Sequence, residues 1–172
     1  LHSLLNAGMR RRNALTIRIL LATAVRSAEL YKARWEHVDL EEARWHIPKS
    51  KTGAAMDIPL APIVVDWLKA LRTLAGESAF VLPAHSRGRA ARHGGDTHVS
   101  KDTIREAIGY WLDAEKPAVR RFTPHDLRST MKSHMRALGV PRDISEMCLN
   151  HKLSGVEGIY DRHTYFEERK DA

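Results

Sequence analysis

Apolar residues recur along most of the chain with the spacing of helices. This periodicity covers residues 11–25, 61–76, 100–114 and 123–141. Pro62 stands where the second of these helices should begin and Gly76 where it should end. Thr123 with Pro124 opens the fourth helix, and Ser100 lies near the expected cap of the third.

Shorter helices are predicted near both ends of the chain. The first follows Arg26, with Ser27 as its candidate N-cap. Two or three more are expected at the end of the chain, over residues 142–151, 155–160 and 164–172. Helices therefore account for most of the predicted structure.

Residues 43–60 show a different pattern, the alternation of apolar and polar residues. Trp45 and Ile47 alternate with polar neighbours, and a polar stretch with a glycine leads to a second alternating run, so a β-hairpin is predicted. Val38 and Leu40 just upstream can supply a third strand. The expected fold class is mainly α with a small antiparallel β-sheet, an α+β domain.

One long segment, residues 84–98, shows neither pattern. It is basic and contains glycines. We expect a loop there that is mobile or ordered only by a ligand.

Composition narrows the class of protein. The chain has 172 residues, of which 43% are hydrophobic, enough for one domain with a sizeable core. The 28 Lys and Arg exceed the 21 Asp and Glu and give a net charge of +7, which favours nucleic acid as a partner and an acidic membrane surface second. The single cysteine favours a reducing, intracellular compartment. The N-terminus lacks a signal-peptide pattern and an initiator Met, as if cut from a longer chain.

Two pairs of polar residues suit the binding of phosphate. His125 and Arg128 are three positions apart, so both should project from one face of the first turns of their helix. Arg26 lies at a helix junction, with Glu29 one turn further on to orient its neighbours. Two guanidinium groups can bind the nonbridging oxygens of one phosphodiester in a forked geometry that lysine cannot reproduce. Taken singly, the arginines could be surface residues and the histidine a capping or core residue.

Lys51 is expected at the tip of the predicted hairpin. A lysine on a flexible turn can reach into a minor groove or give its proton to a leaving oxygen. Hairpin tips also carry lysines for solubility, so Lys51 gains meaning only from its context. Near the end of the chain, Tyr160 and Tyr165 leave open which of them, if either, is a nucleophile.

Six residues, in their order and spacing, resemble the catalytic domain of tyrosine recombinases, the phage integrase family. The set is Arg26, Lys51, His125, Arg128, His151 and Tyr160. The motifs are an Arg followed by xxEL, a Lys before Thr-Gly, the HxxR box, and Leu-x-His with a Tyr nine residues beyond that histidine. The stretches "HDLRST", "LNH" and "IYDRHTYFEERKDA" look most similar to prophage-type integrases, and the resemblance covers about residues 15–170. Tyr160 matches the family's spacing from His151, whereas Tyr165 does not and is expected to pack against the following helix.

The resemblance implies cleavage and rejoining of DNA strands without hydrolysis. Tyr160 would attack a phosphodiester and form a 3′-phosphotyrosyl bond, which stores the bond energy for rejoining. No metal, ATP or other cofactor is implied. Arg26, Arg128 and His151 would stabilise the charge that develops on the phosphoryl oxygens.

The same resemblance assigns the remaining roles. Lys51 would act as general acid toward the departing 5′-oxygen, and His125 would take or share the proton of the tyrosine. The chain departs from the family pattern at Ala24 and Asn150, which stand where glycine is common. Neither replaces a catalytic group.

Partners are also implied by the resemblance. They are double-stranded DNA that carries a crossover site, and other copies of the chain in a tetramer on DNA, which would be weakly associated or monomeric when free. Backbone phosphates would be contacted by Arg87, Arg89, Arg92 and Lys101, although residues 84–98 could equally be a solvated insertion. We expect a cytoplasmic protein at the bacterial nucleoid, without a membrane partner. Residues 1–172 would be the C-terminal catalytic domain, with the family's upstream core-binding and arm-binding domains absent from this chain.

Other classes stay open at this point. A type IB topoisomerase uses a similar residue set for swivelling, although the short tail after Tyr160 and the HxxR box favour a recombinase. A DNA-binding module that has lost catalysis would bind DNA without forming an adduct. A basic RNA-binding domain would need aromatic stacking platforms that this sequence lacks. His85, His93 and His98 invite a zinc site, but one cysteine and no paired ligand spacing argue against it.

Overall fold

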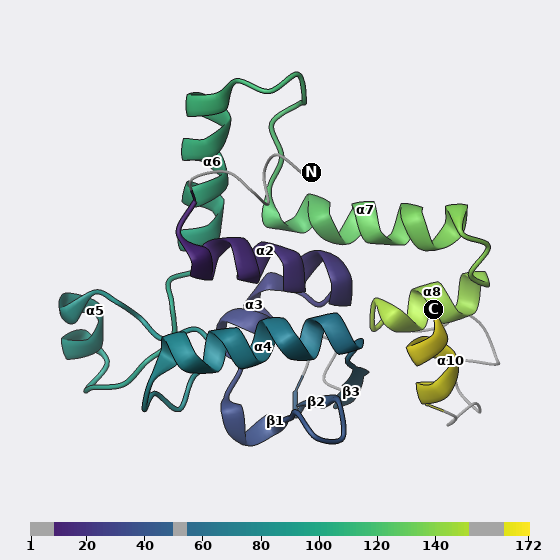
Figure 1. Ribbon diagram of the computed structural model, residues 1–172, viewed down its shortest axis with the longest axis horizontal. Helices are drawn as coiled ribbons and strands as arrows, with labels where there is room; N and C mark the ends of the chain where they lie inside the picture. Colours follow the sequence, from purple (N-terminus) through teal and green to yellow (C-terminus); the bar gives the residue numbers. More distant parts are fainter. Residues whose placement is uncertain (1–8, 50–54, 152–163) are drawn as a thin grey trace.

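The computed structural model describes residues 9–49, 55–151 and 164–172, which form helices around one small sheet (Figure 1). The helices are α2 (Arg11–Thr23), α3 (Ser27–Tyr31), the 3₁₀ helix η1 (Trp35–His37), α4 (Pro62–Ala75), α5 (Arg87–Arg92), α6 (Thr103–Glu115), α7 (Pro124–Ala137), α8 (Arg142–Cys148) and α10 (Phe166–Asp171). The strands are β1 (Val38–Asp39), β2 (Arg44–Ile47) and β3 (Met56–Pro59). The predicted class, mainly α with a small antiparallel sheet, is confirmed. Among these described helices, none has the length and apolar composition needed to span a membrane.

Helix α2 forms the centre of the core. Ile17, Ile19 and Leu20 are buried, and α4, α6 and α7 all pack against the helix. A helix that is apolar on several faces must be covered on several faces, and these three helices provide that cover. The helix ends at Ala24, which has a left-handed φ of 50°. This end of α2 lies beside α7, because Arg128 of α7 donates to the Ala24 carbonyl, and the candidate site is built there.

The sheet has the predicted antiparallel order β1-β2-β3, in which Trp45 of β2 lies opposite Ile58 of β3. Exposed and buried residues alternate along β2, with Trp45 and Ile47 buried. This is the period of a strand that covers a core on one face only. Residues 50–54, which hold the predicted tip and Lys51, and the helix predicted at 155–160 lie outside the described residues.

The predicted N-cap of α3 is wrong by one residue. Ser27 is the first residue of the helix, and Arg26 is the N-cap, with extended backbone angles of φ −67° and ψ 139°. The Arg26 N–H donates to the Glu29 carboxylate at 2.8 Å. This bond is the half of a capping box in which the carboxylate at the third helical residue satisfies the N–H of the cap residue.

Residues 84–98 also differ from the predicted loop, because they contain the short helix α5. The Ser86 hydroxyl caps this helix by accepting from the Arg89 N–H at 3.3 Å. An isolated bridge joins Pro83 to His98, and Arg89 Nε donates to the His98 carbonyl at 2.8 Å. The two ends of the segment are thus held together, and α5 is bonded to the second of them. Helix α5 lies at one end of the longest axis of the molecule, and α8 and α10 lie at the other (Figure 1).

Candidate functional site

The start of α7 is fixed by a capping box. Thr123 precedes the helix, Pro124 occupies its first turn, and the Asp126 carboxylate accepts hydrogen bonds from both the hydroxyl and the N–H of Thr123, each at 2.8 Å. These bonds from Thr123 hold the pKa of Asp126 below its usual value. Such a cap sets the direction in which the chain enters the helix, and so it sets where Arg128, on the next turn, projects.

Arg128 is a buried cation with 6% exposure. Its Nη1 donates to the carbonyl of Ala24 and its Nη2 to the carbonyl of Leu149. These two residues end α2 and α8, where unpaired carbonyls carry partial negative charge. The pKa of Arg128 falls to about 10, chiefly because of burial and then because of the charge on Arg26. Arg128 therefore stays positive at neutral pH and is held rigidly by two helix ends.

Arg26 approaches the same place from the junction of α2 and α3. Its Nη1 forms an ion pair with Glu29 Oε1 at 3.1 Å, and its Nη2 makes a weak contact of 3.5 Å with the Asn150 carbonyl. The predicted orienting role of Glu29 thus has a basis in geometry, since its carboxylate holds both the backbone and the side chain of Arg26.

His151 completes the basic cluster, which we define as Arg26, Arg128 and His151. Its Nε2 lies 3.2 Å from Arg128 Nη2, and its Nδ1 lies 2.6 Å from Glu146 Oε2. The other oxygen of Glu146 pairs with Lys132 Nζ at 2.5 Å. The His151 side chain is 42% exposed, so the cluster opens to solvent on that side.

Sequence reasoning missed Glu146 and Lys132. The one available signal was an acidic residue five positions before His151, which points to nothing unless the chain is known to turn back at the end of α8. Hydrogen bonds from Lys132, and then from His151, hold the pKa of Glu146 below its usual value.

His125 is exposed on the first turn of α7, and it makes no hydrogen bond or ion pair with another described residue. The structure thus brings Arg26, Arg128, His151 and Glu29 together, whereas His125 is exposed and is not bonded to these four residues. Lys51 and Tyr160 lie outside the described residues. Tyr165 immediately precedes α10, and its carbonyl accepts from the Arg169 N–H at 2.9 Å.

A cleft adjoins the basic cluster. On one side it is lined by Met147, Asn150 and His151, and on the other by strands β2 and β3 and the start of α10. The remaining lining residues are Arg44, His46, Ala55, Met56, Asp57, Thr164, Phe166 and Arg169. Ala55 and Thr164 are the first described residues after the segments that hold Lys51 and Tyr160.

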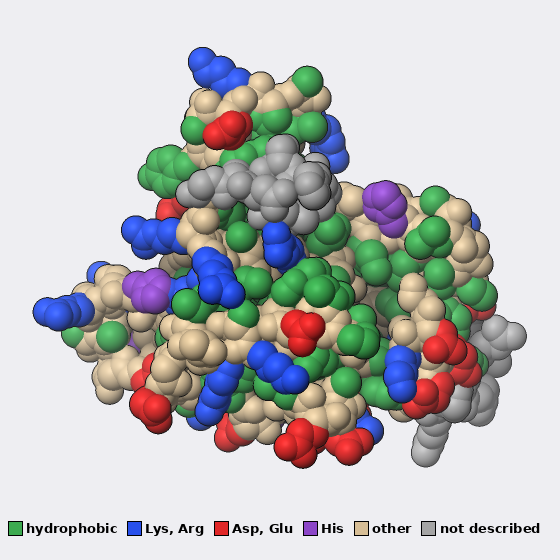
Figure 2. All heavy atoms as spheres, in the orientation of Figure 1, with side chains coloured by type: hydrophobic (Ala, Val, Ile, Leu, Met, Phe, Trp, Pro, Cys, Tyr) green, Lys and Arg blue, Asp and Glu red, His purple; other side chains and the backbone are tan. Residues whose placement is uncertain are grey.

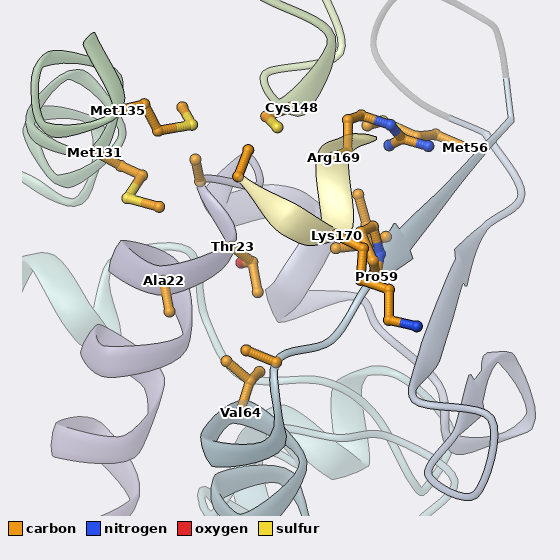
Figure 3. A pocket seen from close by; sticks show the side chains of 14 residues that line it. Ala22, Thr23, Met56, Pro59, Val64, Met131, Met135, Cys148, Arg169 and Lys170 are labelled. Carbon is orange, nitrogen blue, oxygen red and sulfur yellow. The ribbon is translucent and has the colours of Figure 1, made fainter. Parts of the chain in front are cut away.

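Behind the cluster lies an apolar cavity of about 280 Å³. Met131 and Met135 of α7, Cys148 of α8 and Val64 of α4 point toward it, whereas the guanidinium of Arg169 lies over by Met56 (Figure 3). Burial raises the pKa of the Cys148 thiol, which suits a packing residue better than a reactive one. We assign this cavity to the packing of α10 onto α7, α8 and β3.

The two departures from the family pattern fall at left-handed residues. Ala24 has a φ of 50° and Asn150 a φ of 48°. Glycine adopts such angles at the least cost, and asparagine tolerates them better than most residues. Each position lets the backbone turn so that a neighbouring carbonyl, that of Ala24 or Leu149, meets Arg128.

The residues predicted to contact DNA phosphates lie away from the cluster. Arg87 and Arg92 are exposed on α5 and Lys101 is exposed before α6, whereas Arg89 is half-buried and bonded to the His98 carbonyl. Figure 2 shows Lys and Arg side chains at the end formed by α5, with Asp and Glu along the edge formed by the sheet and α10. Among the residues that the structure describes, no three His, Cys, Asp or Glu side chains gather as metal ligands.

The fold and the basic cluster are those expected of a phage integrase catalytic domain, and comparison with known proteins gives the same family. The model of the phage integrase family matches residues 2–167, and the chain belongs to this family. It is 32% identical over 160 residues to the prophage integrase IntZ and 28% identical over 153 residues to the prophage integrase IntA, both of Escherichia coli (strain K12). These matches cover 90% and 87% of the chain but 36% and 34% of the relatives, so the chain spans about a third of their length.

The fold is shared with solved structures. The Tn1549 transposon integrase in complex with circular intermediate DNA superposes with a TM-score of 0.71 at 16% identity, over 99% of this chain and 61% of that one. At that identity the likeness bears on the fold alone.

Proposed function

We propose that the whole protein is a site-specific DNA recombinase that cleaves and rejoins strands through a 3′-phosphotyrosyl bond to Tyr160. The observation that carries the proposal is the basic cluster, in which Arg128 contacts His151 and Arg26 contacts the Asn150 carbonyl, while Asn150 and His151 line the adjoining cleft. Because the chain belongs to the phage integrase family, the reaction that we assign to this cluster is the cleavage and rejoining of DNA strands.

The basic cluster suits the transition state of phosphoryl transfer. Charge grows on the nonbridging oxygens in that state, and donors that are already oriented stabilise it without reorganisation. Arg128 is oriented by two helix carbonyls and Arg26 by Glu29. The Coulombic influence of Arg26 on Arg128 also means that two cations are held close together, an arrangement that a bound phosphate would relieve.

The remaining roles follow from the family resemblance. Tyr160 would attack phosphorus, Lys51 would protonate the departing 5′-oxygen, and His125 would take or share the phenol proton. His151 and Thr164, the described residues on either side of the segment that holds Tyr160, both line the cleft. This supports a nucleophile at that cleft.

The partner in this proposal is double-stranded DNA with a crossover site. Solved structures that share the fold include DNA complexes, such as that of the Tn1549 transposon integrase, and the net charge of +7 suits a polyanion. In the whole protein, core-binding and arm-binding domains would add affinity, four copies would assemble on two duplexes, and the work would be done in the cytoplasm at the nucleoid.

Covalent capture tests the proposal. The full-length protein is incubated without Mg²⁺ with fragments of its source genome, and denaturant-resistant adducts are isolated and their DNA is sequenced. Tyr160→Phe should abolish the adducts, whereas Tyr165→Phe, the matched control, should keep them.

The outcomes separate the rival classes. Adducts enriched at one site and lost in Tyr160→Phe support the recombinase. Adducts that persist in Tyr160→Phe contradict the assigned nucleophile. Adducts spread over all sequences favour a topoisomerase, and DNA binding without any adduct favours a silent binder.

A further inference from the structure

Glu146 holds His151 at two points. The carbonyl of Glu146 accepts from the His151 N–H at 3.0 Å, and its carboxylate Oε2 meets His151 Nδ1 at 2.6 Å. Both contacts depend on the reversal of the chain at Asn150, where φ is 48°. The histidine is therefore fixed in position and in ring orientation by one residue of α8.

The Glu146 carboxylate is an ionised group at neutral pH. Lys132 lies 2.5 Å from its Oε1, and hydrogen bonds from Lys132 and then from His151 keep the pKa of Glu146 below its usual value. Its side chain is 18% exposed, so solvent screens it only in part.

This carboxylate decides which nitrogen of His151 is available. Since Nδ1–H donates to Glu146, Nε2 is the nitrogen that faces Arg128 Nη2, at 3.2 Å. Without an anion, Nε2 accepts from the guanidinium. If a phosphate oxygen is to receive hydrogen bonds from both groups, the ring must take up a second proton from solvent and become an imidazolium.

We propose that Glu146 is a positioning residue that aims His151 Nε2 at the DNA phosphate and stabilises the imidazolium that donates to it. The inference rests on the proposed function for its substrate, although the contact between Glu146 and His151 does not. A carboxylate behind a histidine is a common device for fixing tautomer and orientation.

Other charged groups also face this pair. Arg128 and Lys132 approach from α7, and Arg26 approaches from the junction before α3. Across the cleft lie Arg44, His46, Asp57 and Arg169, with His46 and Asp57 paired at 2.7 Å. Among the described residues, Glu146 is the carboxylate in direct contact with the His151 ring.

The first test compares cleavage by the full-length protein on its captured DNA site. Glu146→Gln keeps a hydrogen-bond acceptor but removes the charge. We expect the single-turnover rate of adduct formation to fall about tenfold, with noncovalent DNA affinity within about twofold. Because the imidazolium loses its counter-charge, the fall of the rate toward high pH should begin at a lower pH than in the unaltered protein.

Two controls separate positioning from a structural role. Lys132→Met breaks the ion pair between Lys132 of α7 and Glu146 of α8. Glu36→Gln removes a carboxylate of η1 that pairs with Arg34. Glu36→Gln should cleave within about threefold of the unaltered protein, and Lys132→Met, which leaves the carboxylate behind His151 in place, should lose clearly less activity than Glu146→Gln. If Glu146→Gln and Lys132→Met lose the same activity and thermal stability, Glu146 merely ties two helices together and the inference is wrong.

A second readout does not require cleavage. In ¹⁵N-histidine-labelled protein, with the ring signal assigned through His151→Gln, the His151 titration curve should move to lower pH in Glu146→Gln. An unmoved curve overturns the inference even if Tyr160 forms adducts. A moved curve together with no adduct overturns the proposed function and leaves the coupling of Glu146 to His151 standing.

Discussion

Arginines at the two ends of the molecule serve it in opposite ways. Arg128 is buried, and its guanidinium is bonded to two backbone carbonyls and to His151. Arg87 and Arg92 are exposed on α5, at the far end of the longest axis. All three attract a polyanion, but only the first has a fixed direction.

The difference lies in what each position costs. Burying a guanidinium is unfavourable, and the lowered pKa of Arg128 reflects this penalty. The carbonyls of Ala24 and Leu149 at two helix ends offset it. An exposed arginine avoids the penalty and gains no orientation. A site for chemistry therefore needs the surrounding fold, whereas a surface for DNA attraction needs only charge.

Arg128→Lys should remove the fixed orientation that distinguishes Arg128 from the exposed arginines of α5. Lysine keeps the charge but cannot bond to Ala24, Leu149 and the phosphate at once. We expect adduct formation to fall about 10²- to 10³-fold, measured by single-turnover cleavage, and the melting temperature to fall because two carbonyls lose their donor.

Arg92→Lys on α5 is the matched control, because it makes the same chemical change at an exposed position. It should leave both cleavage and melting unchanged. Equal losses in the two variants would mean that charge alone, and not orientation, accounts for the role of Arg128.

Asn150→Val should damage the site through the backbone alone. A β-branched residue fits poorly at a φ of 48°, so we expect a loss of stability of about 1–2 kcal/mol, measured by denaturant unfolding. The cleavage rate should fall as well, since the turn sets both the Leu149 carbonyl and His151. Asn150→Gly accepts the same angle and should retain both properties; a Val variant as stable as the Gly variant would contradict this account.

The features of the site that could be predicted from the sequence are those that depend on residues near one another in the chain. His125 and Arg128 were predicted to share a helix because a spacing of three is a property of any helix, and the long apolar run of α2 was predicted from its own residues. The partners of Arg128 are backbone carbonyls 104 and 21 residues away. No side-chain pattern marks a carbonyl, so the contacts that aim the guanidinium could not be predicted.

Glu146 and α5 were missed for related reasons. The Glu146 carboxylate reaches His151 only because the chain reverses at Asn150. Helix α5 is too short to be stable by itself, and the bridge between Pro83 and His98 together with the bond from Arg89 holds it in place. In both cases the tertiary fold decides what the local sequence leaves open.

The smallest effect is expected when the exposed arginines of α5 are removed. In Arg87→Ala/Arg92→Ala, the affinity of the full-length protein for DNA should fall a few-fold near physiological salt, and the slope of log affinity against log salt should become shallower by up to about two. The cleavage rate at saturating DNA should not change, because neither side chain touches the basic cluster. A salt titration of binding, with Glu77→Gln beside it as a charge change at another exposed position, measures this directly. An unchanged slope would show that α5 does not contact the duplex, and a lower cleavage rate at saturation would show that α5 takes part in orienting the DNA.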